Sequence, residues 1–580
     1  MRLIPRLADA LRSPARLAGF VRRLGELALR GELGATLHRL RPRAFSEQEY
    51  RVWRASLPWT PPAAGAGPRF VLVLDAADAG ALRRMRDGCG AAMRAACAVV
   101  ARDAEGAGFR PLDGGDAAPL ASVLARLDAD WMLWVTSRST LDPLAWAAFA
   151  EGCERRGARI VYADHDAADG AGRPARPSFK PAWDRWQILE RDYAGPLLAV
   201  HRDLVASIDA PRLPGNAGPW RTLIEASATL PDEAVVHAPR VVAHAPPARN
   251  TVQEERAAVL PALRDAARAR GLALEVVGGV APWLRYAGSP SVSIVVPTRD
   301  RARLLRRCLE AVAQTREGRE VEVVVVDNGS SDRGVHEAIE RARRTMPVEV
   351  VGCAEAFNFP RLCNVGVAAA RGDVVVLLNN DTVVQPGWLR ELAALAVQPG
   401  VGAVGPLLAY PGGDLQSAGV LLGVNRTATS ALAGFSPDDP AARAWCGARR
   451  RVSVVLGACL AIRRTTYGAV GGLDERFAVS HNEVDFCLRL EAAGYANLFT
   501  PYARVLHDEG ATRGFEVTPA ERARLAAEER AFRERWGALL QPCDPAYHPA
   551  LARAGVPFAL GAPGEPVAPR AGWRCAHGDA

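Results

Sequence analysis

Two runs of branched apolar residues, each ending in an acid, constrain the fold most. Residues 321–326 run into Asp327, and residues 373–378 run into Asn379, Asn380 and Asp381. Strands this apolar are buried on both faces, as in parallel sheets covered by helices. Helical spacing of apolar residues follows or precedes these strands, at 304–314, 336–344 and 388–397. The sequence therefore predicts an α/β fold with a mostly parallel sheet and helices on both faces.

The chain is long enough for more than one such unit, because 580 residues exceed an ordinary single core. Strand-like runs also occur in the first half, at 70–75, 98–102, 130–135 and 159–162. We expect two tandem α/β domains. The expected division is a basic helical segment (1–60), a first α/β domain (68–245), a helical linker (246–288), a second α/β domain (289–515) and a C-terminal helix with an irregular tail (516–580).

The first 45 residues carry ten arginines and three acids, a net charge of +7. Their leucines fall at helical spacing, which fits either an amphipathic helix at a membrane surface or a helix packed on its own protein. The sequence contains no apolar run of about 18 residues, so we expect no membrane-spanning helix. The eleven cysteines are scattered and include no C-x-x-C pair. This pattern is typical of free thiols in a reducing compartment. We expect a cytoplasmic protein, with peripheral contact to the inner face of the membrane through residues 1–45.

The acids at the strand ends are candidate ligand-binding groups, since open α/β sheets bind ligands beyond the carboxyl ends of their strands. Asp381 could hold Mg²⁺ or Mn²⁺, which prefer oxygen ligands, or it could cap the next helix. Asp327 could accept hydrogen bonds from a nucleobase or ribose, or it could close an Asx-turn. The residue type alone does not decide between the ligand-binding and the structural role of either acid.

Two later residues are candidates of the same kind. Glu483 begins a predicted helix and could take a proton from an acceptor hydroxyl, or it could only complement the helix dipole. His507 ends a strand-like run and could complete a metal shell, or it could be structural.

Seven segments in this order resemble family 2 of the inverting GT-A glycosyltransferases, most of all the bacterial rhamnosyltransferase-like branch that builds cell-surface polysaccharides. The segments are SIVVPT at 293–298, VDNGS at 326–330, RLCNVG at 361–366, LLNND at 377–381, LGAC at 456–459, VGGLD at 470–474 and NEVD at 482–485. The resemblance covers about 220 residues. It identifies the family rather than the sugar.

The resemblance implies a role for each matching position. Asp381 would be the ligand of a divalent cation, Mn²⁺ or Mg²⁺, with His507 completing the site, and Asp327 would read the nucleobase. The other residues implied in nucleotide-sugar binding are Pro297, Thr298, Arg299, Asn328, Arg361, Asn364, Asn379 and Asn380.

Three positions depart from the family pattern. Asn379 replaces the first acid of the Asp-x-Asp-like motif, and Leu456 replaces a usual threonine on the acceptor side. Glu483 falls where the family usually has its catalytic aspartate, and Asp485 follows two residues on, so both are candidates for the base. The segment 410–451, which ends in three arginines, is expected to shape the acceptor site.

The first half resembles a second domain of the same family through YADHD at 162–166, PSFKPAW at 177–183 and neighbouring segments. Its strand-like run at 131–135 leads into TSRST at 136–140, which contains no acid and carries Arg138. We therefore predict a degenerate, non-catalytic GT-A-like domain that positions the second half. Asp164 and Asp166 leave a second activity open.

These features together predict an inverting transferase. A nucleotide-diphospho-sugar, with dTDP-rhamnose as one candidate, would donate to a glycan or lipid-linked glycan in O-antigen, lipopolysaccharide or capsule synthesis. The alternatives are a nucleotidyltransferase-like enzyme, although no glycine-rich phosphate loop with lysine follows the first strand, and a non-catalytic nucleotide-sugar-binding module. Nucleic-acid binding is not expected, since the basic residues are not interleaved with aromatics.

Overall fold

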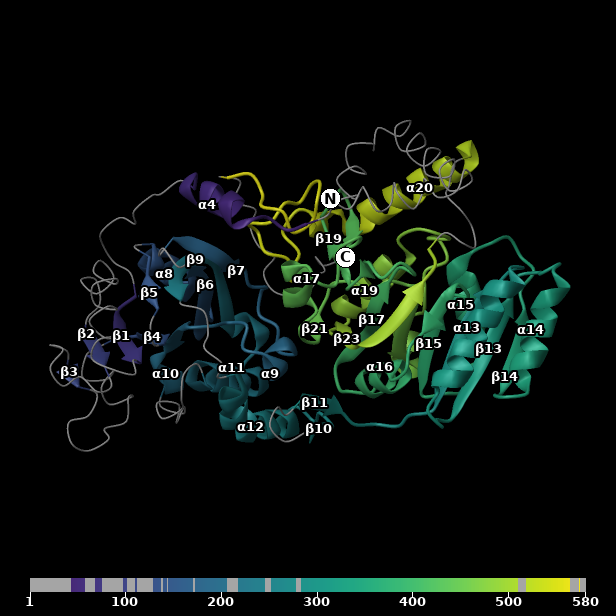
Figure 1. The fold of residues 1–580 in the computed structure, drawn as a ribbon, viewed down its shortest axis with the longest axis horizontal. Coiled ribbons are helices and arrows are strands. Elements are labelled where there is room, and N and C mark those ends of the chain that lie inside the picture. The colour runs from purple at the N-terminus through teal and green to yellow at the C-terminus, as the bar shows by residue number, and fades with distance from the viewer. Residues whose placement is uncertain are drawn as a thin grey trace.

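The computed structural model describes most of the chain. The described residues are 43–57, 68–75, 98–101, 110–111, 129–136, 139–142, 144–169, 173–205, 217–245, 252–277, 283–509, 518–563 and 573. The predicted amphipathic helix before residue 43 and Arg138 both lie outside these ranges. Two α/β units lie side by side, the first in purple and blue and the second in teal and green (Figure 1).

The second unit is built on a ten-stranded mixed sheet with the strand order β14-β13-β12-β15-β22-β17-β23-β16. Its parallel part is β14 to β15, and β22 is antiparallel to both of its neighbours. The strands are β12 (Val292–Thr298), β13 (Val321–Asp327), β14 (Val348–Gly352), β15 (Val374–Leu378), β16 (Thr382–Val384), β17 (Val401–Ala409), β18 (Leu415–Ser417), β21 (Arg450–Arg451), β22 (Cys459–Arg463) and β23 (Ala496–His507). The predicted α/β fold class is confirmed, with antiparallel strands completing the sheet.

Helices cover both faces of this sheet because its central strands are apolar on both sides. Ile294 and Val296 face one core, and Val295 between them faces the other. The first core includes α13 (Ala302–Thr315), α14 (Arg333–Arg343) and α16 (Trp388–Ala396). The second includes α15 (Phe359–Ala369), α18 (Arg464–Ala469) and α19 (Asn482–Ala492). Between β18 and β22 the chain adds the hairpin of β19 (Val420–Leu422) and β20 (Ala428–Ser430) and the helix α17 (Pro440–Trp445).

The first unit repeats this topology, although its described strands include no counterpart of β21. Its sheet has the order β3-β2-β1-β4-β8-β6-β9-β5, and each neighbouring pair has the same direction as its counterpart. The strands are β1 (Phe70–Asp75), β2 (Ala98–Ala101), β3 (Arg110–Pro111), β4 (Trp131–Thr136), β5 (Thr140–Leu141), β6 (Ile160–Ala168), β7 (Pro174–Ser178), β8 (Leu197–His201) and β9 (Val235–Ala245). The helices of this unit are α4 (Glu47–Ala55), α8 (Ala145–Cys153), α9 (Gln187–Glu190), α10 (Arg202–Val205), α11 (Ala217–Thr229) and the 3₁₀ turn η2 (Asp232–Ala234). Shared order and direction throughout indicate two copies of one fold.

Two connections join the units. The linker consists of α12 (Val252–Ala269) and a hairpin of β10 (Leu274–Val277) and β11 (Trp283–Tyr286), where a helical linker was expected. The C-terminal segment continues through α20 (Pro519–Trp536) and η3 (Gly537–Leu540), then crosses back over the first unit (Figure 1). There the indole nitrogen of Trp573 donates to the Trp183 carbonyl at 2.7 Å.

A buried arginine fastens the interface between the units. Arg449 donates to both oxygens of Glu391, at 2.5 and 2.9 Å, and to Glu190 of the first unit at 2.5 Å. The rings of Tyr286 and Tyr502 lie 5.0 and 4.5 Å from its guanidinium carbon. The side chain is only 2% exposed, so each charge depends on its partners for stabilisation.

The two arginines that follow also face the first unit. The backbone nitrogen of Arg451 donates to Asp184 at 2.8 Å, and Arg450 lies over the ring of Trp445. The three arginines that end the segment 410–451 are therefore engaged at the junction, and a role of this segment in shaping the acceptor site stays a prediction. Their charges are used at the junction because the carboxylates that pair with them come from α9 and its surroundings, which the sequence does not place there.

Replacing Arg449 with methionine is expected to destabilise the protein by about 3–5 kcal/mol, because Glu190 and Glu391 would remain buried without a counter-ion. The measurement is chemical denaturation followed by tryptophan fluorescence. Arg443→Met is the matched control, since among the described residues Arg443 has an ion pair with Asp438 alone and is 68% exposed. Equal stability of the two variants would contradict a stabilising role for Arg449.

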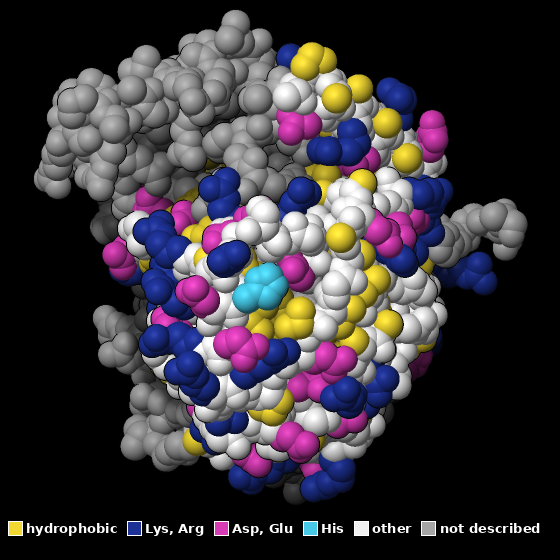
Figure 2. Space-filling view, turned by 90° about the vertical axis from the view of Figure 1, so that its right-hand side faces the viewer, with side chains coloured by type: hydrophobic (Ala, Val, Ile, Leu, Met, Phe, Trp, Pro, Cys, Tyr) yellow, Lys and Arg dark blue, Asp and Glu magenta, His cyan; other side chains and the backbone are white. Residues whose placement is uncertain are grey.

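The outer face of the second unit mixes charges of both signs. Figure 2 shows Lys or Arg side chains interspersed with Asp and Glu on this face. Several of them pair, as in Arg341 with Glu310 at 3.1 Å and Arg371 with Glu349 at 2.9 Å. Such exposed pairs contribute about 0–1 kcal/mol each, so they serve solubility more than stability. Among the helices that the structure describes, none is long and apolar enough to cross a bilayer.

Candidate active site

Asp381 and His507 meet at the edge of the second sheet. Asp381 follows β15 directly before β16, and His507 is the last residue of β23, paired with Thr382 of β16. The Asp381 Oδ1 atom lies 3.2 Å from His507 Nε2, and both side chains are nearly buried. Neighbouring strands thus bring together two residues that are 126 positions apart in the chain.

Hydrogen bonds fix which nitrogen of His507 faces Asp381. Gln416 of β18 donates its amide nitrogen to Glu509 at 3.1 Å, so its amide oxygen points at His507 Nδ1, 2.9 Å away. Tyr410 donates to the same Glu509 oxygen at 3.0 Å. His507 Nδ1 therefore carries a proton, and Nε2 presents its lone pair to Asp381.

A lone pair and a carboxylate oxygen at 3.2 Å need a positive charge between them, either a proton or a metal ion. Adjacent ligands of an octahedral shell with bonds of ~2.1 Å lie about 3 Å apart, so the spacing suits Mg²⁺ or Mn²⁺. A histidine whose second nitrogen is anchored by an acceptor is the usual arrangement around such an ion. The residues present therefore fit a divalent cation.

Gln416 was not anticipated from the sequence, because a single amide in a strand of three residues carries no motif. We expect Gln416→Leu to weaken Mn²⁺ affinity about 10- to 100-fold, since the ring of His507 would lose its anchor. Calorimetric titration with Mn²⁺ measures this. The control is Ser417→Ala, at the residue next to Gln416. It removes only a hydrogen bond to the Gly419 carbonyl and should bind Mn²⁺ with unchanged affinity. Unchanged affinity in Gln416→Leu would exclude a role in orienting the histidine.

Glu483 lies on the same side of the sheet as this pair. The backbone strip around Gly457 connects them: Asn379 donates to the Ala458 carbonyl at 3.0 Å, and a methyl group added at Gly457 would lie 3.6 Å from the Glu483 Cβ. Glu483 occupies the first turn of α19. Burial raises the pKa of its carboxyl, which suits a group that must accept a proton near neutral pH.

Asp485 is engaged elsewhere. Its Oδ2 accepts from Arg489 at 2.8 Å, and its Oδ1 accepts from Trp536 at 2.9 Å with Arg535 at 3.0 Å. The carboxyl is fully buried and ties α19 to α20. Its candidacy as base therefore finds no support in the geometry, because one oxygen is held by Arg489 of α19 and the other by α20.

The strand ends next to the pair carry the residues expected along the nucleotide. Thr298 ends β12 after Pro297, and its hydroxyl accepts from Asn380 at 3.0 Å. Asp327 ends β13, where its Oδ1 closes the turn by accepting from the Ser330 amide and hydroxyl at 3.0 and 2.6 Å. The Asx-turn reading thus holds for one oxygen, and among the described residues Oδ2 has no hydrogen bond. Arg299 is exposed in the loop that follows.

Asn328 and Asn364, expected at the donor pocket, are used to hold loops. The Asn328 amide donates to the carbonyls of Cys353 and Glu355 at 2.7 and 2.9 Å. Asn364 accepts from the Tyr467 hydroxyl at 2.5 Å and donates to the Leu473 carbonyl at 2.9 Å.

These bonds occupy the amide nitrogen of Asn328 and both ends of the Asn364 amide, so the contribution of these groups to donor binding would come through the loops. Arg361, one turn before Asn364 on α15, is partly exposed and lies 3.4 Å from Glu355 and 3.9 Å from Glu475. Its guanidinium is therefore placed at the surface of the site.

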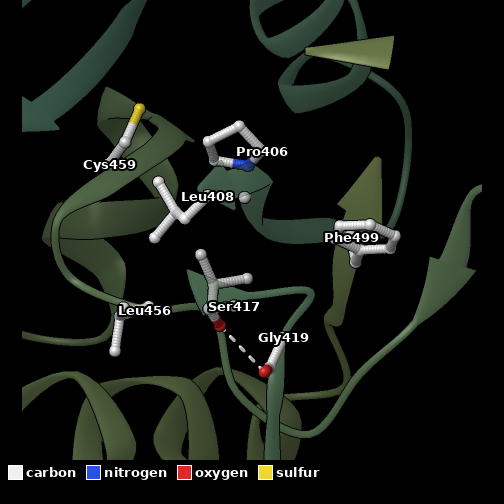
Figure 3. A pocket seen from close by; sticks show the side chains of 9 residues that line it. Pro406, Leu408, Ser417, Gly419, Leu456, Cys459 and Phe499 are labelled. Carbon is white, nitrogen blue, oxygen red and sulfur yellow. Dashed lines mark hydrogen bonds between the residues drawn. The ribbon is translucent and has the colours of Figure 1, made fainter. Parts of the chain in front are cut away.

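A small cavity lies behind the strip that carries Gly457. Figure 3 shows Leu456, Cys459, Leu408 and Ser417 around it, with the Ser417 hydroxyl bonded to the Gly419 carbonyl at 3.0 Å. Its volume is about 10 Å³, the space of a single water molecule. The cavity is too small for a sugar, so Leu456 acts here as packing behind the site.

Asp164 and Asp166 of the first unit are both sequestered. Asp164, His237 and His548 are close enough to share a metal ion. However, the Ala550 amide donates to His548 Nδ1 at 3.0 Å, so His548 Nε2 carries a proton and donates to Asp164 at 2.7 Å. Although burial alone would raise it, the pKa of Asp164 lies well below its usual range because of both histidines. The cluster is a buried hydrogen-bonded clamp on the C-terminal segment.

The sheet order, the carboxylate and histidine at the ends of its strands and the glutamate across the glycine strip define a glycosyltransferase of the GT-A class. Residues 293–457 match the family described as Glycosyl transferase family 2. The chain is 32% identical over 227 residues to the N-acetylglucosaminyl-diphospho-decaprenol L-rhamnosyltransferase of Mycobacterium tuberculosis, covering 36% of this chain and 73% of that protein. The chain belongs to glycosyl transferase family 2.

Two longer relatives extend over both units. An uncharacterised protein, y4gI of Sinorhizobium fredii, is 34% identical over 70% of this chain and 46% of its own length. The O-antigen biosynthesis protein RfbC of Myxococcus xanthus is 30% identical over 67% of this chain and 32% of its own length. The chain thus spans less than half of each of these relatives.

Among solved structures, the mannosyltransferase PcManGT from Pyrobaculum calidifontis, in complex with GDP-Man and Mn²⁺, aligns with a TM-score of 0.33 and 21% identity. The alignment covers 44% of this chain and 69% of that chain.

Proposed function

We propose that the second unit transfers a sugar from a nucleotide-diphospho-sugar to a hydroxyl group of a glycan or lipid-linked glycan, with inversion at the anomeric carbon. The observation that carries this proposal is the Asp381–His507 pair, with Nε2 oriented for a cation and Glu483 across the Gly457 strip. Mn²⁺ or Mg²⁺, held by these two residues, would neutralise the charge that develops on the leaving diphosphate.

The protein side chains then have separate tasks. Glu483 accepts the proton of the acceptor hydroxyl, and this oxygen attacks from the face opposite the diphosphate, so a single displacement inverts the configuration. Asp327 and the loop of Pro297, Thr298 and Arg299 bind the nucleoside. Gln416 keeps the His507 ring in place through its Nδ1 atom. The Asn379 amide nitrogen lies 3.5 Å from the other ring nitrogen, Nε2.

The donor and the pathway follow from the relatives as part of this proposal. A relative named as an L-rhamnosyltransferase favours dTDP-rhamnose as donor, and a relative named for O-antigen biosynthesis favours cell-surface polysaccharide as product. The basic segment before residue 43 would bring the enzyme to the anionic inner face of the membrane, where lipid-linked acceptors are found.

The first unit, residues 68–245, serves as a non-catalytic scaffold in this proposal, joined through the linker at 246–288 to the catalytic unit at 289–515. The supporting observations are the buried Arg449 junction and the sequestration of Asp164 and Asp166. The C-terminal segment from residue 516 clamps both units together.

The decisive experiment measures nucleotide release from a panel of donors, including dTDP-rhamnose, UDP-N-acetylglucosamine and GDP-mannose, with Mn²⁺ and with membrane lipid extract as the source of acceptor. Transfer from one donor that requires both Mn²⁺ and acceptor supports the proposal and names the sugar. If no donor is turned over although one binds by calorimetry, the protein is a nucleotide-sugar-binding module.

A further inference from the structure

The matching topology of the two sheets shows which residue of the first unit corresponds to His507. Thr140 pairs with His244 between β5 and β9, as Thr382 pairs with His507 between β16 and β23. In both units a threonine of the short edge strand pairs with a histidine of the long strand beside it. His244 is therefore the counterpart of His507.

The same comparison places Ser139 where the second unit has Asp381. Three residues separate the end of β4 from Thr140, and three separate the end of β15 from Thr382. Ser139 and Asp381 are each the last of these three. The first unit has therefore lost the carboxylate of its cation pair and kept the histidine.

His244 also keeps the orientation of its counterpart. Its Nδ1 lies 2.5 Å from Asp166 Oδ1, which anchors the ring as Gln416 anchors His507. Its Nε2 faces a group of charged atoms, 4.0 Å from Asp142 and 3.4 Å from a guanidinium nitrogen of Arg54. The ring thus points at Arg54, where its counterpart points at the proposed cation.

Arg54 comes from α4, a helix outside the sheet. Its guanidinium donates to Asp142 at 2.8 Å, to Asp166 and to the Tyr50 hydroxyl at 3.0 Å. Tyr50 in turn donates to Asp166 at 2.7 Å. Asp166 is fully buried, so its charge requires a cation in this place.

We propose that Arg54 is a built-in cation that fills the former cation site of the first unit and closes it. One histidine and two carboxylates surround this one positive group. Aromatic contacts hold α4 over the site: the ring of Phe179 lies 6.3 Å from Tyr50 and 5.9 Å from Trp53, and Trp53 donates to the Gly561 carbonyl at 3.0 Å. Loss of Asp at 139 and gain of Arg54 together explain why this unit would not use a metal-bound donor.

The test removes the guanidinium and offers a metal ion instead. It uses the full chain carrying Asp381→Ala, so that the second unit contributes no metal response. Adding Arg54→Ala should lower the melting temperature by several degrees in EDTA, because Asp142 and Asp166 lose their counter-ion. Mn²⁺ or Zn²⁺ should restore most of this loss, since His244 and both carboxylates would then bind the ion.

Arg51→Ala in the same background is the control. Arg51 lies one turn earlier on α4 and pairs at the surface with Glu47 and Asp169, so its loss should shift melting little and create no response to metal. If Arg54→Ala melts like Arg51→Ala, Arg54 does not fill a charged site. If it melts lower but neither ion restores it, the surrounding groups do not form a cation site. Either result overturns the proposal.

Arg54→Met covers the case in which the alanine variant does not fold, since it keeps the volume of the side chain and should show the same metal-dependent recovery. This inference rests on the assignment of Asp381 and His507 as cation ligands. Its readout is melting temperature, so a failure of sugar transfer in the donor panel and a failure of metal recovery here are separate results.

Discussion

Asp381→Ala is expected to lower Mn²⁺-dependent sugar transfer about a thousandfold. The cation that Asp381 would share with His507 supplies several kcal/mol of stabilisation to the leaving diphosphate, and each 1.36 kcal/mol corresponds to about tenfold in rate. Donor affinity should fall as well, because the same ion would bridge the diphosphate to the protein. Initial rates at saturating donor, measured over a range of Mn²⁺ concentrations, separate the two effects.

Asp438→Ala is the control for this experiment, since Asp438 is exposed and pairs only with Arg443 at 3.0 Å. It should retain full activity. An Asp381→Ala enzyme that still requires Mn²⁺ and keeps its rate would contradict the assignment of Asp381 as a cation ligand. The ion would then be held by other residues.

Glu483→Gln is expected to lower the rate of transfer by about 10²- to 10⁴-fold, the range typical of a lost general base. Glutamine keeps the size of the side chain, so Mn²⁺ and donor binding should be unchanged. Because burial raises the pKa of Glu483, the wild-type rate should rise with pH through a pKa above the ordinary 4.5 of a glutamate. The carboxylate is the active form, so activity is lost as the pH falls below that pKa, and this limb of the profile should disappear in Glu483→Gln.

Asp485→Asn distinguishes the two acids of the NEVD segment. Its carboxyl is bound by Arg489, Arg535 and Trp536, so the substitution should lower the melting temperature while the acid limb of the pH profile stays in place. A variant at Asp485 that loses the acid limb, beside a Glu483→Gln enzyme that keeps it, would reverse the assignment of the base.

Local sequence determined the central elements of the second unit. The apolar runs at 321–326 and 373–378 are strands β13 and β15, and the helical spacing at 304–314, 336–344 and 388–397 corresponds to α13, α14 and α16. These segments could be read because strand and helix periodicity is a property of neighbouring residues. The same holds for the acids at the strand ends, since Asp327 ends β13 and Asp381 lies just after β15, which places both beyond the carboxyl ends of the sheet's strands.

Residues whose partners are distant in sequence could not be assigned in this way. Asp485 and Glu483 are two residues apart on one helix. Arg489, four residues on, pairs with one oxygen of Asp485, but only the packing of α20 shows that Trp536 and Arg535 occupy the other. Asn364 looks like a ligand-binding amide until Tyr467 and Leu473, about 100 residues later, are seen to occupy it.

The first unit shows the same division. From sequence, the missing acid in TSRST and the basic Arg138 within it together predict a degenerate domain. Only the tertiary structure shows that Ser139 is the counterpart of Asp381, and that Arg54, about 190 residues from His244 in the chain, lies at the ring nitrogen of that histidine. The sequence by itself thus determined strands, helices and the residues at their ends. Which charges meet was decided by sheet order and helix packing, because electrostatic partners are chosen by distance in space and not along the chain.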